Sequence, residues 1–271
     1  MRRRSMIAML AIISLLPAAA TNGQLGPHTT THSAGTAAET TVEIPRVTRV
    51  RLRSGVALEV TEAGRADGQP VLFLHGYPDS RLSFSRLLPL LPSNVRAIVP
   101  TQRGHGNSDR PSRCYRPKDF AKDAIELLDA LGIPTATVVG HSMGSFVAMR
   151  LALSAPKRVT RLVLIGSAYS AQSPSVLEVA KTVRTLVDPV PAEFVREFQK
   201  STINEPVPAE FFEQVVSESM KAPARVWRDV LAGLIAKPTV GNLTRIKVPT
   251  LIVWGDKDGL FDRASQEKLQ R

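Results

Sequence analysis

The stretch VVGHSMGSFVAMRLAL, residues 138–153, decides the fold. It joins a short apolar run, typical of a buried strand, to a run with helical spacing through the pentapeptide GHSMG (140–144). The pentapeptide fits G-x-S-x-G, in which the glycines allow a strained strand-to-helix turn that lifts the serine above the sheet. Alone it is a weak signal, but the strand before it and the helix after it complete the pattern. We therefore predict that Ser142 is a nucleophile; a serine at a glycine-rich turn without catalysis is the alternative.

Short, continuously apolar runs recur along the chain. They are VLFLH (71–75), VRAIVP (95–100), ATVVG (136–140), RLVLIG (161–166) and TLIVWG (250–255). Such runs are typical of strands that are buried on both faces of a parallel sheet. Before them, Val47–Arg53 and Val56–Ala63 alternate like a half-buried hairpin. Helical stretches such as Pro117–Leu131 separate the runs, so the sequence predicts the α/β class with a mostly parallel sheet.

About eighty residues separate the strand that ends at Gly166 from the one that begins at Val248. They include four amphipathic segments with helical spacing, SVLEVAKTVRTLV, PAEFVREFQKST, PAEFFEQVVSESM and ARVWRDVLAGLI. A connection this long in a compact domain is usually a functional lid. We predict a helical cap at 169–247, inserted after the sixth strand of a core formed by 47–168 and 248–271. The large apolar residues of the cap serve either as its core or as a pocket wall: Phe194, Phe198, Phe211, Phe212 and Trp227.

The first residues have the pattern of a targeting segment. The basic MRRRS precedes the apolar run MIAMLAIISLLP, and small residues follow. This run is shorter than the ~20 residues that span a bilayer, so we predict a signal peptide at 1–20 and a secreted or periplasmic protein without stable membrane association after cleavage. A buried N-terminal helix or an uncleaved anchor is the alternative. Residues 21–46 are predicted to be a flexible linker, whose His28 and His32 are interpreted as exposed rather than metal-binding.

Charge and cysteine content exclude several classes of function. The formal net charge is +11, but the basic residues are scattered and accompany no recognition motif, which indicates a solvated basic surface rather than a nucleic-acid site. Cys114 is the only cysteine, so no internal disulfide is expected, and no Cys/His cluster indicates zinc. We expect no cofactor, no metal and no nucleic-acid partner. The sequence does not indicate the oligomeric state.

Two more loops follow predicted strands at the same edge of the sheet. HGYP (75–78) follows the first apolar run, and RGHGNSD (103–109) follows the second. The backbone N–H groups of Tyr77 and Met143 could together hold a developing oxyanion, an arrangement that stabilises acyl transfer by several kcal/mol. We interpret His75 as a structural histidine that supports the first loop, and His105 as a loop residue rather than a base.

With WGDKD (254–258), these motifs stand in the order found in the α/β-hydrolase fold superfamily, each after the expected strand. The chain resembles this superfamily from about Val47 onward. The resemblance implies that Asp258 orients a catalytic histidine, with Asp256 as its nearer rival. Epoxide hydrolases and haloalkane dehalogenases place an aspartate at the elbow, whereas Ser142 favours ester, lactone or related acyl chemistry through an acyl-enzyme. The expected partner is therefore a small-molecule acyl substrate.

The triad order of this superfamily places the histidine after the acid. The five histidines are residues 28, 32, 75, 105 and 141, so none follows Asp258, and only thirteen residues do. We expect a truncated chain that lacks the last strand, the histidine loop and the final helix, with TLIVWG left as an exposed edge strand.

Substitutes for the missing histidine are weak. His141 precedes the nucleophile, so its side chain should point away from Oγ of Ser142. Of the other histidines, His105 is the least unfavourable candidate for the general base. A histidine supplied by a second chain is a further candidate. Two functional alternatives therefore stay open. The chain could be a catalytically inactive, ligand-binding homologue, or it could belong to relatives that perform cofactor-free peroxidation with the same residues.

Overall fold

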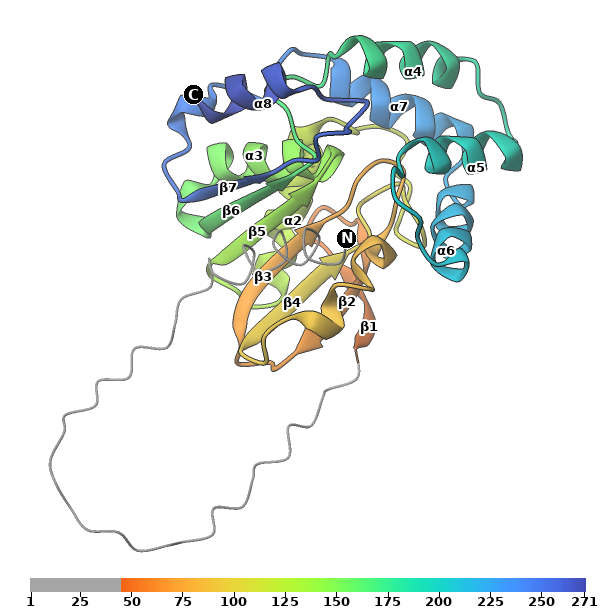
Figure 1. The fold of residues 1–271 in the computed structure, drawn as a ribbon. Helices are drawn as coiled ribbons and strands as arrows, with labels where there is room; N and C mark the ends of the chain where they lie inside the picture. Colours follow the sequence, from red (N-terminus) through yellow and green to blue (C-terminus); the bar gives the residue numbers. More distant parts are fainter. Residues whose placement is uncertain (1–44) are drawn as a thin grey trace, which may run out of the picture.

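A computed structural model describes residues 45–271, so the predicted signal peptide and nearly all of the predicted linker lie outside the described residues. Within this part of the chain, seven strands form one sheet in the order β1-β2-β4-β3-β5-β6-β7 (Figure 1). The strands are β1 (Arg46–Arg51), β2 (Ala57–Gly64), β3 (Gln69–Leu74), β4 (Val95–Pro100), β5 (Ala136–His141), β6 (Val159–Ile165) and β7 (Thr250–Val253). Only the pairings of β2, with β1 and with β4, are antiparallel. The predicted α/β class with a mostly parallel sheet is confirmed.

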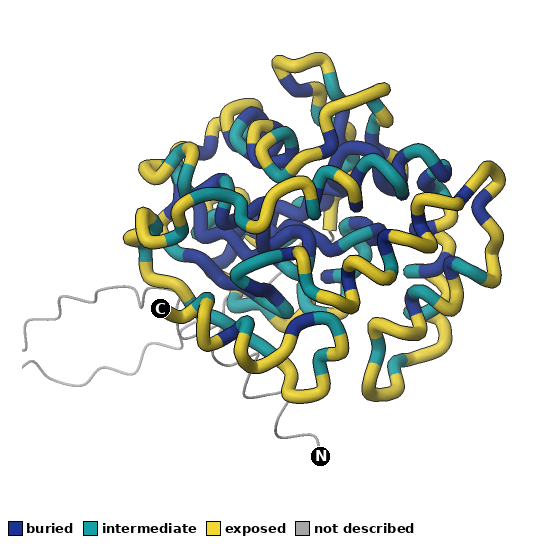
Figure 2. Tube along the Cα trace, turned by 90° about the horizontal axis from the view of Figure 1, so that it is seen from above, coloured by how far each residue is buried: buried dark blue, intermediate teal, exposed yellow. Residues whose placement is uncertain are grey.

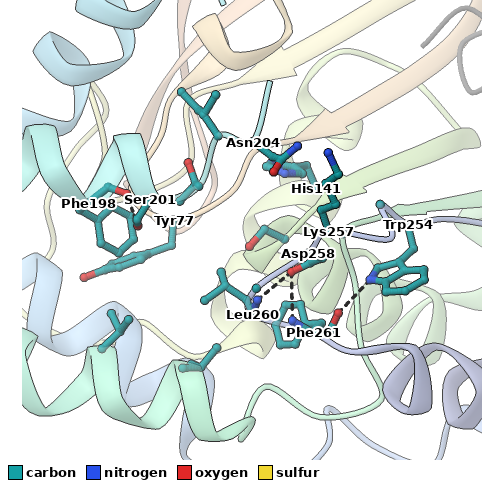
Figure 3. Close-up of a pocket in the computed structure, with 18 of the residues that line it drawn as sticks. Tyr77, His141, Phe198, Ser201, Asn204, Trp254, Lys257, Asp258, Leu260 and Phe261 are labelled. Atoms are coloured by element: carbon teal, nitrogen blue, oxygen red, sulfur yellow. Dashed lines mark hydrogen bonds between the residues drawn. The ribbon is translucent and has the colours of Figure 1, made fainter. Parts of the chain in front are cut away.

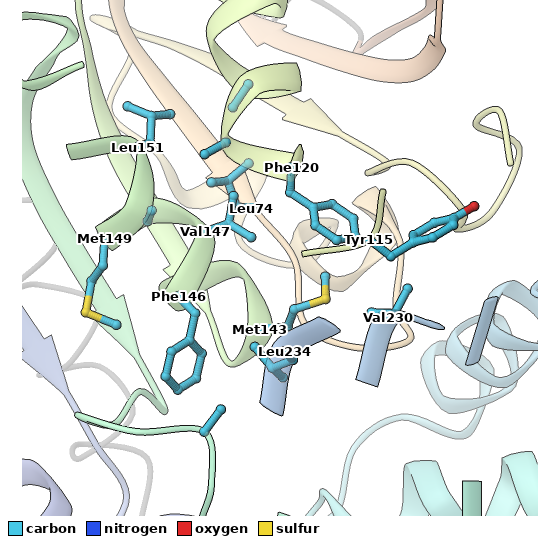
Figure 4. Close-up of a cluster of buried hydrophobic side chains, with 14 of the residues drawn as sticks. Leu74, Tyr115, Phe120, Met143, Phe146, Val147, Met149, Leu151, Val230 and Leu234 are labelled. Atoms are coloured by element: carbon cyan, nitrogen blue, oxygen red, sulfur yellow. The ribbon is translucent and has the colours of Figure 1, made fainter. Parts of the chain in front are cut away.

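The sheet is covered by apolar clusters on both faces, because alternate residues of a strand point to opposite sides. Leu72 and Leu74 of β3 belong to the larger cluster, which includes residues of α2 (Pro117–Ala130) and α3 (Met143–Ser154) (Figure 4). Phe73 of β3 belongs to the second cluster and packs on Phe84 of the short helix η1 (Arg81–Phe84), with ring centroids 5.2 Å apart. Burial on both faces explains why these strands are continuously apolar in sequence.

The connection between β6 and β7 folds into four helices, as the sequence predicted. They are α4 (Pro174–Arg184), α5 (Ala192–Ser201), α6 (Ala209–Met220) and α7 (Ala224–Ile235). Pro191, Pro208 and Pro223 stand directly before the last three, where a missing N–H costs no helical hydrogen bond. These cap helices lie over the end of the sheet at which β5 runs into α3 (Figure 1). The limits 169–247 for a separate cap domain stay a prediction.

The sheet ends at β7, which pairs only with β6 among the described residues. Its four residues are exposed or half-buried, in contrast to the buried centre of the sheet (Figure 2). The residues after Asp258 form the helix α8 (Arg263–Gln270), and the side chain of Asp262 caps it by accepting from the N–H of Ser265. Loops that carry the predicted site residues leave the carboxyl ends of β3, β5 and β7, where open α/β sheets commonly bind ligands.

Candidate active site

Ser142 lies at the tight turn between β5 and α3, with φ 49° and ψ −119°. Residues other than glycine rarely adopt a positive φ, and such strain tends to occur at functional sites. The turn is held by the N–H of Ser142, which donates to the carbonyl oxygen of Ile165 at 2.9 Å. It is also held by close packing, because a Cβ added at Gly144 would lie 2.0 Å from the carbonyl oxygen of Leu74. The glycine after the serine is therefore required by the approach of α3 to β3.

The predicted oxyanion donors flank Ser142. Met143 is the first residue of α3, where the N–H has no acceptor within the helix. Tyr77 follows Gly76, and a Cβ added at Gly76 would lie 3.3 Å from Cβ of Ser142, so the loop after β3 runs against the elbow. Within residues 45–271 neither the Tyr77 nor the Met143 N–H donates a hydrogen bond to the protein. The oxyanion role of the two groups stays a prediction.

Asp258 lies in the loop after β7 and is fixed by backbone donors. Its Oδ1 accepts from the N–H groups of Leu260, at 2.8 Å, and Phe261, at 3.0 Å (Figure 3). Its Oδ2 is near the turn after β6, at 3.9 Å from the position of a Cβ added at Gly166. The rival carboxylate, Asp256, is exposed. Of the two aspartates, Asp258 is the one that the surrounding backbone orients, although its role as the triad acid stays a prediction.

The ring of His141 lies between the loops that carry Tyr77 and Asp258. Its Nδ1 would be 3.1 Å from a Cβ added at Gly76, and its Nε2 3.9 Å from one added at Gly166. Burial lowers the pKa of His141, and the charges of Asp79 and Asp258 oppose that effect. The ring was expected to point away from Oγ of Ser142; the structure places it on the wall of the same pocket, and within the described residues it makes no hydrogen bond.

His75 and His105 are buried inside their loops. Nε2 of His75 accepts from the N–H of Gln102 at 2.8 Å, and its Nδ1 donates to the carbonyl oxygen of Gly76 at 2.8 Å. The interpretation of His75 as a structural histidine is thereby confirmed. Nδ1 of His105 lies 2.8 Å from the carbonyl oxygen of Arg103, and burial lowers the pKa of His105 to about 4. Neither ring lines the pocket.

A large pocket, about 1440 Å³, is lined by Ser142, by loops of the core and by residues of the cap helices. Figure 3 shows part of this lining. Phe198, Leu231 and Leu234 of the cap contribute apolar lining. Tyr77 joins the two parts, since its hydroxyl donates to the carbonyl oxygen of Trp227 at 3.0 Å, and burial raises the pKa of Tyr77. Phe198 is thus pocket wall, whereas the fully buried Trp227 is core of the cap.

Two polar residues of the pocket were missed by the sequence analysis. Asp79 stands directly after HGYP, and that position was the signal that could have found it. Gln199 of α5 donates from Nε2 to Oδ1 of Asp79 at 2.9 Å, across 120 residues of sequence. No local pattern predicts such a contact, because it depends on how the cap packs on the core.

Residues 45–271 contain no group of three or more His, Cys, Asp or Glu side chains arranged to hold a metal ion. Over that range no helix is long and apolar enough to cross a membrane.

With the geometry of the elbow established, comparison with known proteins gives the class. Residues 69–271 match the family described as "alpha/beta hydrolase fold". Because this match covers most of the chain, the protein belongs to the α/β-hydrolase fold family.

Individual relatives span several activities. The chain is 42% identical over 108 residues to an epoxide hydrolase of Caballeronia sordidicola, covering 39% of this chain and 32% of that relative. It is 26% identical over 248 residues to Lipase 3 of Moraxella sp. (strain TA144), covering 83% of this chain and 73% of the lipase. It thus spans about a third of the first relative and about three quarters of the second.

Solved structures agree with the fold. A hydrolase from Pseudomonas aeruginosa superposes with a TM-score of 0.73 at 24% identity, covering 82% of this chain and 85% of that one. At this identity the likeness shows the fold alone.

Proposed function

We propose that the protein is a serine hydrolase that cleaves a small ester or related acyl substrate through an acyl-enzyme on Ser142. The observation that carries this proposal is the strained elbow, which holds Ser142 in the lining of a pocket shared by core loops and cap helices. A serine at this position favours acyl chemistry. The lipase relative, which is matched over most of its length, supports the same class.

The proposed reaction has two stages. Oγ of Ser142 attacks the carbonyl carbon of the substrate, and the carbonyl oxygen takes the electron pair as a negative charge. The N–H groups of Tyr77 and Met143 stabilise that charge, the alcohol leaves with a proton, and an acyl-serine ester forms. Water then attacks the acyl carbon, releases the acid and restores the hydroxyl of Ser142.

The proton of Ser142 needs an acceptor. The proposal assigns it to a histidine that Asp258 orients. Within the described residues the one imidazole that lines the pocket is that of His141, and it makes no hydrogen bond to Ser142 or Asp258. This gives the second candidate function its support: a homologue that binds the ligand without turning it over. Peroxidation with the same residues is a third candidate, which product analysis in the presence of peroxide separates from ester hydrolysis.

The proposal extends to the setting of the reaction. The composition of residues 1–20 supports export, with a secreted or periplasmic enzyme as the result. The partner is a small acyl compound, and neither nucleic acid nor a membrane takes part.

The test is the hydrolysis of 4-nitrophenyl butyrate by the wild-type protein, in a form that contains the histidine of the proposal, and by Ser142→Ala in the same form, together with labelling by a fluorophosphonate probe and mass spectrometry. The variant should lose activity by a factor on the order of 10³ or more and lose the label, because the attacking oxygen is gone. Ser201→Ala, which changes another serine of the pocket wall, is the matched control and should retain both.

Undiminished turnover by Ser142→Ala would show that the nucleophile is misassigned. A wild-type chain that binds the ester without hydrolysis and resists labelling would support the binding function instead.

A further inference from the structure

Asp79 is a buried carboxylate in the wall of the pocket. It is 9% exposed and lies two residues after Tyr77, in the loop that runs against the elbow. Its own N–H donates to the carbonyl oxygen of Gly76 at 3.0 Å, which fixes the backbone of the loop. Burial of a carboxylate is expensive unless a cation or hydrogen-bond donors compensate for the lost water. The contacts of its two oxygens therefore show which donors compensate for the lost water and which oxygen can still accept a hydrogen bond.

One oxygen is held by the cap. Nε2 of Gln199 donates to Oδ1 of Asp79 at 2.9 Å and to Oγ of Ser219 at 2.8 Å. The hydroxyl of Ser219 donates in turn to the carbonyl oxygen of Val215 at 2.8 Å, one turn earlier in α6. Gln199 and Ser219 are themselves buried. This chain of contacts across two cap helices fixes the plane in which the carboxylate of Asp79 lies.

The other oxygen is free and faces the reaction centre. Within residues 45–271, Oδ2 of Asp79 accepts no hydrogen bond. A Cβ added at Gly76 would lie 3.4 Å from this oxygen and 3.3 Å from Cβ of Ser142. The two groups thus border the same small volume of the pocket, and Nδ1 of His141 lies 3.1 Å from the same position. A substrate whose acyl carbon reaches Ser142 would pass directly beside Oδ2.

No cation of the protein neutralises this carboxylate. Among the ion pairs of residues 45–271, none includes Asp79. The imidazoles whose pKa responds to its charge are His105 and His141, and burial lowers both pKa values, which keeps the rings neutral near pH 7. Of the basic residues that line the pocket, Lys257 already pairs with Glu205 at 3.6 Å on the exposed rim.

We propose that Oδ2 of Asp79 binds a hydrogen-bond donor of the substrate, a primary ammonium or a hydroxyl group, beside the acyl carbon that Ser142 attacks. The substrate class is then an amino- or hydroxy-substituted ester rather than a plain apolar one. This inference rests on the proposed function for the nature of the substrate, but the binding that it requires does not depend on a reactive Ser142. Charge-assisted hydrogen bonds are the stronger ones, so the ammonium group is the preferred donor.

The experiment measures the binding of hexylammonium and of 1-hexanol to the whole chain by isothermal titration calorimetry. Asp79→Asn keeps the shape of the side chain and an oxygen for Gln199, and removes the charge. It should weaken hexylammonium binding by about tenfold or more, the usual effect of losing a hydrogen bond to a charged group. Binding of the neutral 1-hexanol should change by less than about threefold, because its hydroxyl can turn and accept from the amide N–H that replaces Oδ2. Asp79→Ala is the second variant, for which the same loss of hexylammonium binding is expected.

Asp256→Asn is the matched control, since it removes the same charge from the exposed rim of the pocket. It should alter hexylammonium binding by less than about threefold, because charges in water are well screened. Equal losses of hexylammonium affinity in the Asp79 and Asp256 variants would overturn the proposal. They would show that binding depends on the overall negative potential of the pocket and not on a contact with Asp79. The proposal would also be overturned by wild-type affinity for hexylammonium in Asp79→Asn, or by an absence of binding to the wild-type chain at millimolar concentration.

The same measurements separate this proposal from the function on which it draws. If hexylammonium binding depends on Asp79 but no ester is hydrolysed, the Asp79 subsite is supported and the proposed hydrolase function is refuted. If ester hydrolysis requires Ser142 but hexylammonium binding does not change in the Asp79 variants, the hydrolase function is supported and the Asp79 subsite is refuted.

Discussion

Mild acid should destabilise the fold through His105. The ring is fully buried, and its pKa falls from an ordinary value of 6.5 to about 4. The unfolded chain therefore binds a proton more readily than the folded one, and stability falls as the pH drops from 6.5 towards 4. Each pH unit inside that window costs about 1.4 kcal/mol. Lowering the pH from about 7.5 to about 5 should thus reduce the free energy of unfolding by about 2 kcal/mol through this residue.

The assay is urea unfolding at both pH values for the wild-type chain and for His105→Asn. The amide of asparagine can still donate to the carbonyl oxygen of Arg103, which Nδ1 of His105 faces at 2.8 Å. His75 and His141 also titrate, but they are present in both proteins and cancel in the comparison. The charges of Asp79 and Arg110 act on His105 in opposite directions and are part of the net pKa shift that the comparison measures. An equal loss of stability in both proteins would refute the reasoning, since His105 would then be protonated without cost in the folded state.

Two further predictions concern packing and charge. Gly144→Ala should destabilise the protein by about 3 kcal/mol or more in thermal or urea unfolding, although alanine is the better helix former, because the new Cβ would meet a backbone oxygen at 2.0 Å. Gly255→Ala meets nothing within 4 Å and should be tolerated. Asp123→Asn should cost about 3–5 kcal/mol in the same assay because it leaves the buried guanidinium of Arg103 without its carboxylate partner. Arg196→Ala removes an exposed ion pair and should have no measurable effect.

The sheet was predictable because its strands are buried on both faces. Leu72 and Phe73 are adjacent in sequence, point to opposite faces and are both fully buried, so β3 shows an unbroken apolar run. The elbow was predictable for a similar local reason, since Gly140 and Gly144 stand where the backbone has no room for a Cβ. Helix limits also followed from local signals, such as Pro117 at the first position of α2.

The composition of the pocket wall was not predictable to the same degree. The ring of His141 is placed by the loops after β3, β6 and β7, which meet only in the folded chain. The contact between Asp79 and Gln199 joins the core to the cap and leaves no periodic trace in the sequence. Phe198 and Trp227 are both aromatic residues on amphipathic helices, yet one lines the pocket and the other is buried in the cap. Whether an apolar side chain of the cap lines the pocket or is buried depends on packing between helices, and the sequence pattern of a single helix does not determine it.

The strain at Ser142 bears on the choice between a hydrolase and a binding protein. Glycine adopts a positive φ without cost, whereas a residue with a Cβ held in such a region costs about 1–3 kcal/mol. Within the described residues, Oγ of Ser142 makes no hydrogen bond that would offset this cost; the contacts of the turn are made by the backbone of Ser142. A protein that only bound its ligand would lose nothing by carrying glycine here. The proposed reaction needs a hydroxyl held in such a position, beside a pocket and two N–H groups that are free within the described residues, and this supports the proposed hydrolase over the binding protein.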